Sequence, residues 1–123
     1  MVYSVDHIAD ILGYAKKCVE KGNKYLLDHI KFHECDGREG LEKYGPYDVI
    51  HLGGAVTDMP IEIISQLVEG GVIFAPVGTD SQRIFIWEKE KNGQLKMEGK
   101  LQVQYGPLMS REEHMKRIQA YQK

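Results

Sequence analysis

Two short apolar runs, separated by about twenty residues, constrain most strongly what this chain can fold into. The first is Tyr47–Leu52, which is followed by two glycines, and the second is Val72–Ala75, which is followed by Pro-Val-Gly. Of these two runs, Val72–Ala75 is continuously apolar, which indicates a strand covered on both faces, as parallel strands require. Between them, helical spacing begins at Pro60 and ends at Gly70-Gly71. The sequence therefore predicts a strand, a helix and a second parallel strand, the basic unit of an α/β fold.

The N-terminal third predicts the same kind of unit. Val2–Val5 is a short strand, and apolar residues at helical spacing follow from Ile8 until Gly22-Asn23. Asp6 is placed to cap this helix, and the glycine and asparagine are placed to end it. Ile30–Cys35 is the next strand. The first 78 residues therefore predict a mostly parallel sheet.

The last third predicts an antiparallel hairpin and a helix. Arg83–Glu88 is a strand, Asn92-Gly93 predicts a type I′ turn, and residues 95–105 alternate between apolar and polar as a half-buried strand does. Ser110-Arg111-Glu112-Glu113 is a capping box that opens a terminal helix. The inward residues that we expect in that helix are Met115, Ile118 and Tyr121.

The composition predicts a single soluble domain over residues 1–123. Net charge is −2, from 16 basic and 18 acidic residues, so no strong field attracts nucleic acid or an anionic membrane. No apolar run approaches the roughly 20 residues that cross a bilayer, and the N-terminus lacks a signal-peptide pattern. The two cysteines form no disulfide framework, which predicts a reduced, cytoplasmic setting.

Acidic residues follow two of the predicted strands. Asp6 could accept the hydroxyls of a ribose, because doubly wound folds bind nucleotides at the carboxyl ends of their strands; taken alone, it is better explained as a helix cap. Asp36 could accept a hydrogen bond from an adenine amino group while Gly37 lets the backbone approach the ring, and a plain turn explains the pair equally well. Both acids fall on the same side of the sheet.

Histidines supply a weaker signal. His51, at the end of its strand, could orient a substrate or carry a proton, or it could be a packed strand-end residue. His33 and Cys35 share one strand face, but no Cys-x-x-Cys or His-Glu-x-x-His spacing is present, so we predict no metal site. There is also no Gly-x-Gly-x-x-Gly or Walker loop.

Several of these segments, taken together, resemble the protein-L-isoaspartate (D-aspartate) O-methyltransferase family. The matching segments are Val5-Asp6-His7-Ile8, Asp36-Gly37-Arg38 with Gly40, Tyr47–Gly53, Pro76-Val77-Gly78 and Val103–Leu108. They occur in family order from about Val2 to about Arg111. The resemblance implies a class I S-adenosylmethionine-dependent (Rossmann-like) methyltransferase fold, mostly parallel with a C-terminal antiparallel hairpin.

The resemblance also implies an activity and a set of contacts. The family transfers a methyl group from S-adenosyl-L-methionine to the α-carboxyl of isoaspartyl residues, which begins the repair of damaged proteins. By this resemblance Asp6, His7, Asp36 and Gly37 bind the cofactor. The residues that help to hold the isoaspartyl peptide are Pro76, Val77, Val103, Tyr105 and Gly106. The catalytic residue stays open, and His51 is a candidate only from its place at the end of a strand.

The chain departs from the family pattern in three respects. The family's Tyr/Phe-Val-Pro-Leu is Tyr105-Gly106-Pro107-Leu108 here, and the small residues after its His-x-Gly are matched loosely by Gly54-Ala55. The family's N-terminal helices, its Ser/Thr-bearing segment and its first strand with the glycine loop have no counterpart. We therefore expect a truncated form, in which the central strand of a family sheet ordered 3-2-1-4-5-7-6 is missing.

The missing strand leaves alternatives open. Strands with unmade backbone hydrogen bonds favour self-association through the unpaired edges. One alternative to a methyltransferase is therefore a non-catalytic relic that binds a nucleoside, a peptide or a protein. The other is an α/β interaction module that uses those edges.

Overall fold

The computed structural model of the chain describes residues 1–122, which form two compact units. Unit 1 comprises Met1–Leu41 together with the C-terminal residues from Met109, and unit 2 comprises Glu42–Leu108. Each unit has a sheet of its own. The expectation of one domain over residues 1–123 stays a prediction.

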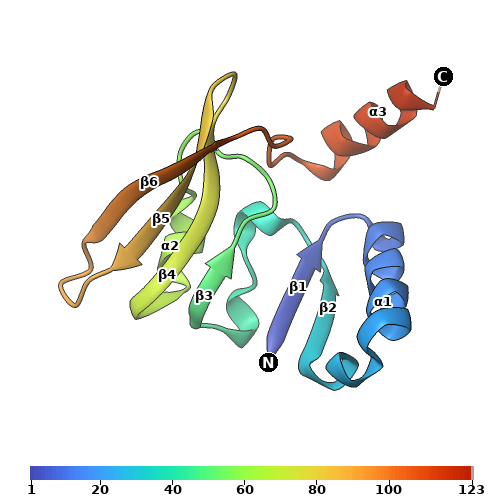
Figure 1. The fold of residues 1–123 in the computed structure, drawn as a ribbon, viewed down its shortest axis with the longest axis horizontal. Coiled ribbons are helices and arrows are strands. Elements are labelled where there is room, and N and C mark those ends of the chain that lie inside the picture. The colour runs from blue at the N-terminus through green and yellow to red at the C-terminus, as the bar shows by residue number, and fades with distance from the viewer. Residues whose placement is uncertain (123) are drawn as a thin grey trace. The chain divides into compact units, whose positions relative to one another are not determined.

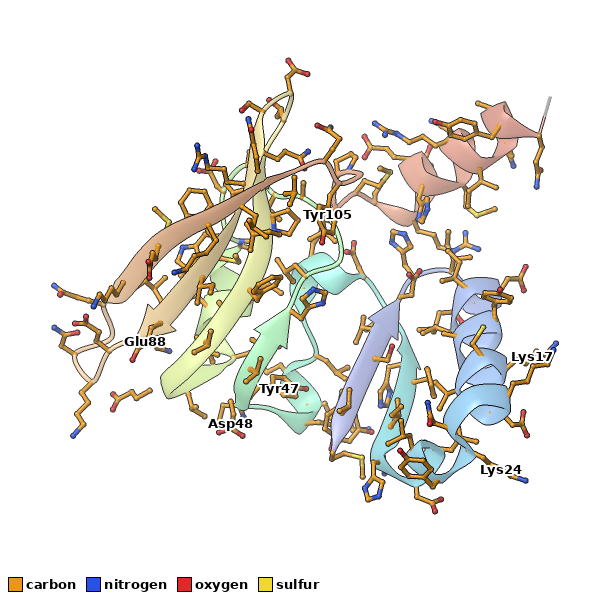
Figure 2. The ribbon with its side chains drawn as sticks, viewed as in Figure 1. Lys17, Lys24, Tyr47, Asp48, Glu88 and Tyr105 are labelled. Atoms are coloured by element: carbon orange, nitrogen blue, oxygen red, sulfur yellow. The ribbon has the colours of Figure 1, made fainter. Side chains whose placement is uncertain are left out.

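Unit 1 is a two-stranded parallel sheet with helices beside it (Figure 1). Strands β1 and β2 pair in register from Val2 opposite Ile30 to Asp6 opposite Glu34. Helix α1 makes the crossover, and on its inner face Leu12 is buried, whereas Lys17 points away from the strands (Figure 2). The elements of this unit are β1 Val2–Asp6, α1 Ala9–Asn23, η1 Lys24–His29, β2 Ile30–Glu34, η2 Gly37–Glu39 and α3 Arg111–Tyr121.

The two helix starts predicted in unit 1 differ in outcome. Asp6 does not cap α1 as predicted: its Oδ1 accepts from the Ile8 N–H, 2.9 Å away, and Ile8 occupies the cap position without a side-chain cap. At the start of α3 the Ser110 cap is confirmed, since the Ser110 hydroxyl accepts from the Glu113 N–H. Along α3, Met115 and Ile118 are half-buried, but Tyr121 is 89% exposed and does not face inward.

Unit 2 is a four-stranded mixed sheet in the order β3-β4-β5-β6. Strand β3 runs parallel to β4, and the β4–β5 and β5–β6 pairs are antiparallel. Figure 1 shows these strands side by side with the short helix α2 behind them. The elements of this unit are η3 Glu42–Tyr44, β3 Tyr47–His51, α2 Ile61–Ser65, β4 Leu67–Gly78, β5 Gln82–Lys89 and β6 Leu95–Val103.

The hydrophobic core of unit 2 gathers around the centre of β4. Ile73 and Ala75 are completely buried, and Trp87 packs against them from β5. The other members of this core are Leu52, Val56, Ile63 and Leu67. The run Val72–Ala75, predicted to be covered on both faces, therefore lies in the interior of this unit, whereas β3 is largely exposed and its Val49 is 68% exposed.

The boundary between α2 and β4 differs from the prediction. The helix ends at Ser65 rather than at Gly70-Gly71, and the strand already begins at Leu67. Its partner strand passes from Tyr47 opposite Leu67 to Val49 opposite Val72, so the residues between bulge out of the ladder. Gly70 has a φ of 79°, and a Cβ at Gly71 would lie 2.7 Å from the Leu67 side chain. The glycines therefore allow a bulge here rather than ending a helix.

The order of the last strands is also corrected. The sheet order that we took from the family places its seventh strand beside its fifth, which would pair β6 with β4. In the structure β4 pairs with β5, for example Val72 with Glu88, and β6 forms the outer strand. A short turn joins β4 to β5, and consecutive strands joined in this way usually lie next to each other.

The β5–β6 hairpin turn is of a different type from the one predicted. Only Gly93 has a positive φ, of 81°, and Asn92 does not. The Glu90 N–H donates to the Gln94 carbonyl and the Gly93 N–H donates to the Glu90 carbonyl. This pattern is a three-residue loop closed by a glycine bulge, not a type I′ turn. Beyond it, Leu95 and Val103 are half-buried as expected, but Met97 and Leu101 are exposed.

Within residues 1–122 no helix is both long and apolar enough to cross a bilayer.

Candidate functional site

The carboxyl edge of the unit 1 sheet holds the predicted nucleoside-binding residues. Asp6 is the last residue of β1, and its carbonyl accepts from the Cys35 N–H at 3.1 Å, so the ends of the two strands are tied together. Asp36 follows directly after this tie. Two carboxylates therefore leave neighbouring parallel strands at the same edge, as the sequence predicted for Asp6 and Asp36.

The two carboxylates differ in how fully they are engaged. Asp6 Oδ1 accepts from the Ile8 N–H, and Asp6 Oδ2 has no partner among the described residues. Asp36 caps the short helix η2 by accepting from the Arg38 N–H at 2.9 Å, and the Arg38 guanidinium binds both of its oxygens. The hydrogen bonds from Arg38 hold the pKa of Asp36 below its usual range. Asp36 is therefore an ionised and heavily bonded acceptor, whereas Asp6 has an oxygen to spare.

His7 connects this edge to the terminal helix. Its Nε2 lies 2.8 Å from Nδ1 of His114 in the first turn of α3, and its carbonyl accepts from Arg111 Nε at 3.2 Å. The short distance between the ring nitrogens requires one to donate and the other to accept. Sequence reasoning missed His114 and Arg111, because nothing in a helix start predicts which distant loop it contacts.

Gly37 and Cys35 have less specific surroundings. Gly37 opens η2 with an ordinary backbone angle, and the positive φ of this turn, 70°, belongs to Gly40. The pKa of the Cys35 thiol is raised mainly by burial, and to a smaller extent by the nearby Asp36 and Glu39 carboxylates. Among residues 1–122, no three His, Cys, Asp or Glu side chains gather as a metal ion requires.

A second candidate site lies at the carboxyl ends of β3 and β4, within unit 2. His51 ends β3 with an exposed side chain that stacks on Phe74, with the ring centroids 5.4 Å apart. The chain then passes through Gly53-Gly54 to Ala55 and Val56, which are both buried. Residues 55 and 56 form the middle of a small backbone ladder.

This ladder brings three distant segments together. On one side the Val56 N–H donates to the Pro76 carbonyl, and the Gly78 N–H donates back to Val56. On the other side the Ala55 N–H donates to the Gly106 carbonyl and the Leu108 N–H donates to Ala55, at 2.9 and 2.8 Å. The ladder therefore places three of the predicted peptide-contact residues next to the segment 55–56, with Pro76 and Val77 on one side of it and Gly106 on the other.

The predicted peptide-contact residues, in this ladder and just before Gly106, differ in their access to solvent. Pro76 is fully buried, so its side chain packs in the interior, while Val77, Val103 and Tyr105 are half-buried and Gly106 is exposed. Sequence reasoning missed Ala55 and Val56. The signal that could have found them is the small residue before them, since a Cβ at Gly54 would lie 3.1 Å from the Leu108 nitrogen.

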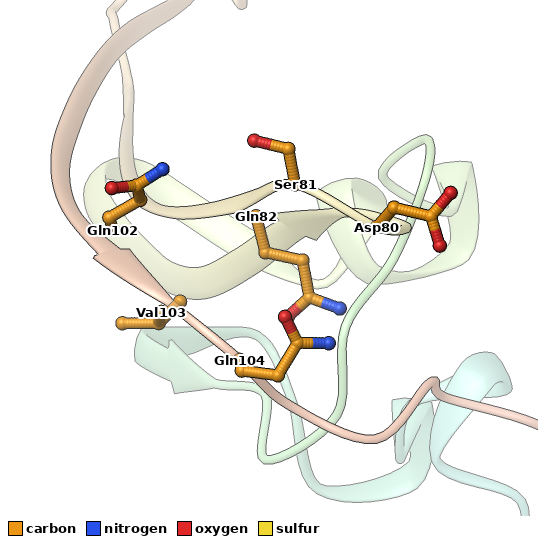
Figure 3. A pocket seen from close by; sticks show the side chains of 6 residues that line it. All are labelled: Asp80, Ser81, Gln82, Gln102, Val103 and Gln104. Carbon is orange, nitrogen blue, oxygen red and sulfur yellow. The ribbon is translucent and has the colours of Figure 1, made fainter.

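Gln82 is a further residue that sequence reasoning missed. It is 4% exposed, and its carboxamide makes hydrogen bonds to Thr79 and to both backbone groups of Tyr105. It lies beside an open hollow of about 560 Å³ (Figure 3). The residues around this hollow are Asp80, Ser81, Gln82, Gln102, Val103 and Gln104.

Comparison with known proteins gives one consistent result. The family model described as protein-L-isoaspartate (D-aspartate) O-methyltransferase matches residues 1–113. The chain is 33% identical over 117 residues to protein-L-isoaspartate O-methyltransferase 2 of Arabidopsis thaliana, covering 93% of this chain and 38% of that protein. It is 34% identical over 110 residues to the enzyme of Triticum aestivum, covering 87% and 48%. The chain thus spans half or less of the length of these relatives.

Solved structures give the same result for the fold. A protein-L-isoaspartate O-methyltransferase from Plasmodium falciparum, in complex with S-adenosyl-L-homocysteine, matches with a TM-score of 0.75 at 20% identity, over 88% of this chain and 52% of that one. A second structure of a protein with the same name matches with a TM-score of 0.76 at 27% identity, over 89% of this chain and 34% of that one. These matches confirm the predicted α/β methyltransferase fold class.

Proposed function

Because the chain belongs to the protein-L-isoaspartate (D-aspartate) O-methyltransferase family, we propose that it serves methyl transfer from S-adenosyl-L-methionine to the α-carboxyl of isoaspartyl residues in damaged proteins. The observation that carries this proposal is the pair of carboxylates, Asp6 and Asp36, at one edge of the unit 1 sheet. In doubly wound folds, nucleotides bind at this edge. Isoaspartyl peptides and proteins are then the partners, and protein repair in the cytoplasm is the setting.

The residues of unit 1 fit the nucleoside part of the cofactor. Asp6 Oδ2, which has no partner among residues 1–122, can accept from ribose hydroxyls. Asp36 can accept from the adenine amino group once the Arg38 side chain, which is 46% exposed, turns outward, and His7 and Gly37 border the same edge. When bound, the cofactor supplies an electrophilic methyl group on a sulfonium ion. The residues named here bind and orient its nucleoside and do not take part in the transfer.

We assign the peptide contacts to the ladder in unit 2 and to residues 103–105, which precede Gly106 in the chain. Val77, Val103, Tyr105 and Gly106 reach the surface there, whereas Pro76 supports them from inside. His51 presents an exposed imidazole at the end of β3, where it could accept or donate a proton at the edge of this site.

Calorimetric titration of the purified chain with S-adenosyl-L-homocysteine tests the cofactor half of this proposal. We expect saturable binding that Asp6→Ala abolishes. Asp10→Ala is the matched control, because Asp10 is an exposed acid only four residues away in α1. Absence of heat at high ligand concentration would refute cofactor binding by this chain. If binding is found, methylation of an isoaspartyl peptide that depends on Asp6 is the test of the reaction.

A second function, as an interaction module, is favoured by the edges of the sheets. Among the described residues, β1 pairs only with β2, and β3 has β4 as its one partner. Unpaired backbone groups at such edges can pair with another chain, including a second copy of this one. Sedimentation tests this possibility: a clean monomer at high concentration would count against self-association.

A further inference from the structure

We propose that Gln82 is a positioning residue, whose carboxamide fixes the backbone of Tyr105 and thereby shapes the peptide-contact segment Tyr105–Leu108. This inference rests on the proposed function of that segment. It concerns only residues of unit 2, and it assigns a role to a buried polar residue that the hydrophobic pattern of β5 does not explain.

The carboxamide of Gln82 pairs with Tyr105 as a strand residue would. Its Oε1 accepts from the Tyr105 N–H at 2.7 Å, and its Nε2 donates to the Tyr105 carbonyl at 3.0 Å. A side-chain amide has the same donor and acceptor as a peptide unit. The two bonds therefore reproduce a pair of ladder hydrogen bonds, with a side chain in place of the backbone.

The hydrogen bonds between Gln82 and Tyr105 lie where the strand pairing of β5 with β6 ends. Gln82 is the first residue of β5 and pairs with Val103, the last residue of β6. Beyond Val103, the chain has no further residue of β5 to pair with. The Gln82 side chain extends toward the segment that carries Gln104, as Figure 3 shows, and so continues the pairing as far as Tyr105, two residues beyond Val103.

The position of Gln82 is fixed by the turn before it. Its Nε2 also donates to the Thr79 carbonyl at 3.0 Å. The turn depends on Gly78, which has a φ of 126° and where a Cβ would clash with the Ser81 carbonyl oxygen. This turn therefore adds a third backbone hydrogen bond to the two that the carboxamide makes with Tyr105.

The peptide-contact segment is thereby held from two sides. Gln82 binds Tyr105, and Ala55 binds Gly106 and Leu108 on the other side. The Gln82 side chain is 4% exposed, and burial of an amide is unfavourable unless its polar atoms are bonded. An apolar residue could fill this space, but it could not hold both backbone groups of Tyr105. Figure 2 shows Tyr105 beyond the end of β6.

The first test is native-state amide hydrogen exchange of the full chain. In Gln82→Met, which keeps the length of the side chain, we expect the protection of the Tyr105 amide to fall by up to about tenfold, because this amide loses its hydrogen-bond acceptor. Protection at Leu108, which donates to Ala55, and at Ile73 in the core should change much less. Equal loss at all three amides would show general destabilisation and would overturn the proposal, as would unchanged exchange at Tyr105.

The second test is binding of a synthetic isoaspartyl peptide, with the aspartyl peptide of the same sequence as reference. We expect Gln82→Met to weaken isoaspartyl binding about tenfold and to leave S-adenosyl-L-homocysteine binding unchanged. Gln94→Met, at an exposed position near the hairpin turn, is the matched control. If Tyr105 loses protection while peptide affinity stays at the wild-type value, the positioning role is wrong.

A second variant covers the case in which Gln82→Met does not fold, and hydrogen exchange separates failure of this proposal from failure of the proposed function. If Gln82→Met does not fold, Gln82→Asn replaces it, because a carboxamide one methylene shorter cannot reach both groups of Tyr105. In that variant, faster exchange of the Tyr105 amide than in the wild type would support the role of the Gln82–Tyr105 hydrogen bonds, and wild-type exchange would refute it. If the wild-type chain binds no isoaspartyl peptide, the proposed function fails, whereas hydrogen exchange still decides whether Gln82 holds the segment.

Discussion

The two units of this chain build their candidate sites from different materials. In unit 1, side chains do the work: an Arg–Asp pair, a histidine pair and one carboxylate on a backbone N–H. In unit 2, backbone hydrogen bonds among residues 55–56, 76–78 and 106–108 form the site, above a buried apolar core. The difference teaches that polar side chains can gather at the edge of a small sheet, whereas the ladder of three distant backbone segments occurs in the unit that has the larger buried core.

The two units also differ in the size of their hydrophobic cores. The buried apolar residues of unit 1 are Ile8 and Leu12, whereas the buried residues of unit 2 include Ile73 at 0% exposure and Trp87 at 6%. Two parallel strands with one flanking helix bury little apolar surface, and short two-stranded sheets have little stability of their own. We therefore expect most of the free energy of unfolding to reside in unit 2.

Removing a core side chain from unit 2 is the strongest way to test this comparison. Ile73→Ala should lower the free energy of unfolding by about 2–5 kcal/mol, because it leaves a cavity in a closely packed interior. Urea titration followed by the fluorescence of Trp87, the single tryptophan, measures it. Leu101→Ala, at a position 73% exposed, is the control and should change little. A loss below about 1 kcal/mol for Ile73→Ala would contradict the assignment of the core.

Glycine substitutions should act in opposite directions in the two units. Gly78→Ala should destabilise unit 2 by more than about 1 kcal/mol, since its φ of 126° and its closeness to Ser81 exclude a Cβ. Gly13→Ala should stabilise unit 1 by roughly 0.5–1 kcal/mol, since Gly13 lies inside α1 with open space around it. Thermal unfolding of both variants by circular dichroism measures these changes, and shifts of the same sign would contradict the prediction.

Removing the contact between His7 and His114 should have a smaller effect, confined to unit 1. His114→Ala removes the contact with His7, and no residue of α3 is buried. We expect amide exchange in α3 to rise several-fold, while exchange in β4 of unit 2 stays the same. His29→Ala, which changes an exposed histidine in η1, is the control. Unchanged exchange in α3 would mean that other contacts hold the helix.

Acid sensitivity should show the smallest effect. Arg38 lowers the pKa of Asp36, so the folded state favours the ionised carboxylate. Its stabilising contribution is complete above the unfolded pKa of about 3.9 and is lost as the pH falls through the lower folded pKa. Arg38→Gln should therefore reduce the stability of unit 1 slightly at neutral pH and make it less dependent on pH below about 4. Amide exchange in β1 between pH 6 and pH 2 measures this, and an unchanged pH dependence would refute the pairing.

The surface pair of unit 2 is the control for that experiment. Lys100 bonds to Glu98 at 2.7 Å and lowers the pKa of this carboxyl, but both side chains are largely exposed. Water and salt screen such pairs, so Lys100→Gln should have no measurable effect on unfolding.

Local sequence patterns predicted the units of this fold well where one segment contains the whole signal. Periodicity and turn residues predicted the crossover helix, the Ser110 cap, and the ends of β1 and β3 to within one residue. The patterns failed where two segments compete. Leu67 and Val68 continue the helical spacing of α2, but Leu67 pairs with β3, so both residues belong to β4 instead of the helix. Asn92-Gly93 likewise fits a type I′ turn until the register of β5 and β6 requires a three-residue loop.

The sequence by itself determined the family, the α/β character of the fold and the residue types at its strand ends, because these depend on short motifs and local periodicity. Only the tertiary structure decided which strands are neighbours, that Arg38 occupies both oxygens of Asp36, and that His7 meets His114. It alone revealed that Gln82 binds Tyr105, 23 positions away in the chain. Contacts between distant positions depend on how the whole chain packs, and no local pattern of residues records that packing.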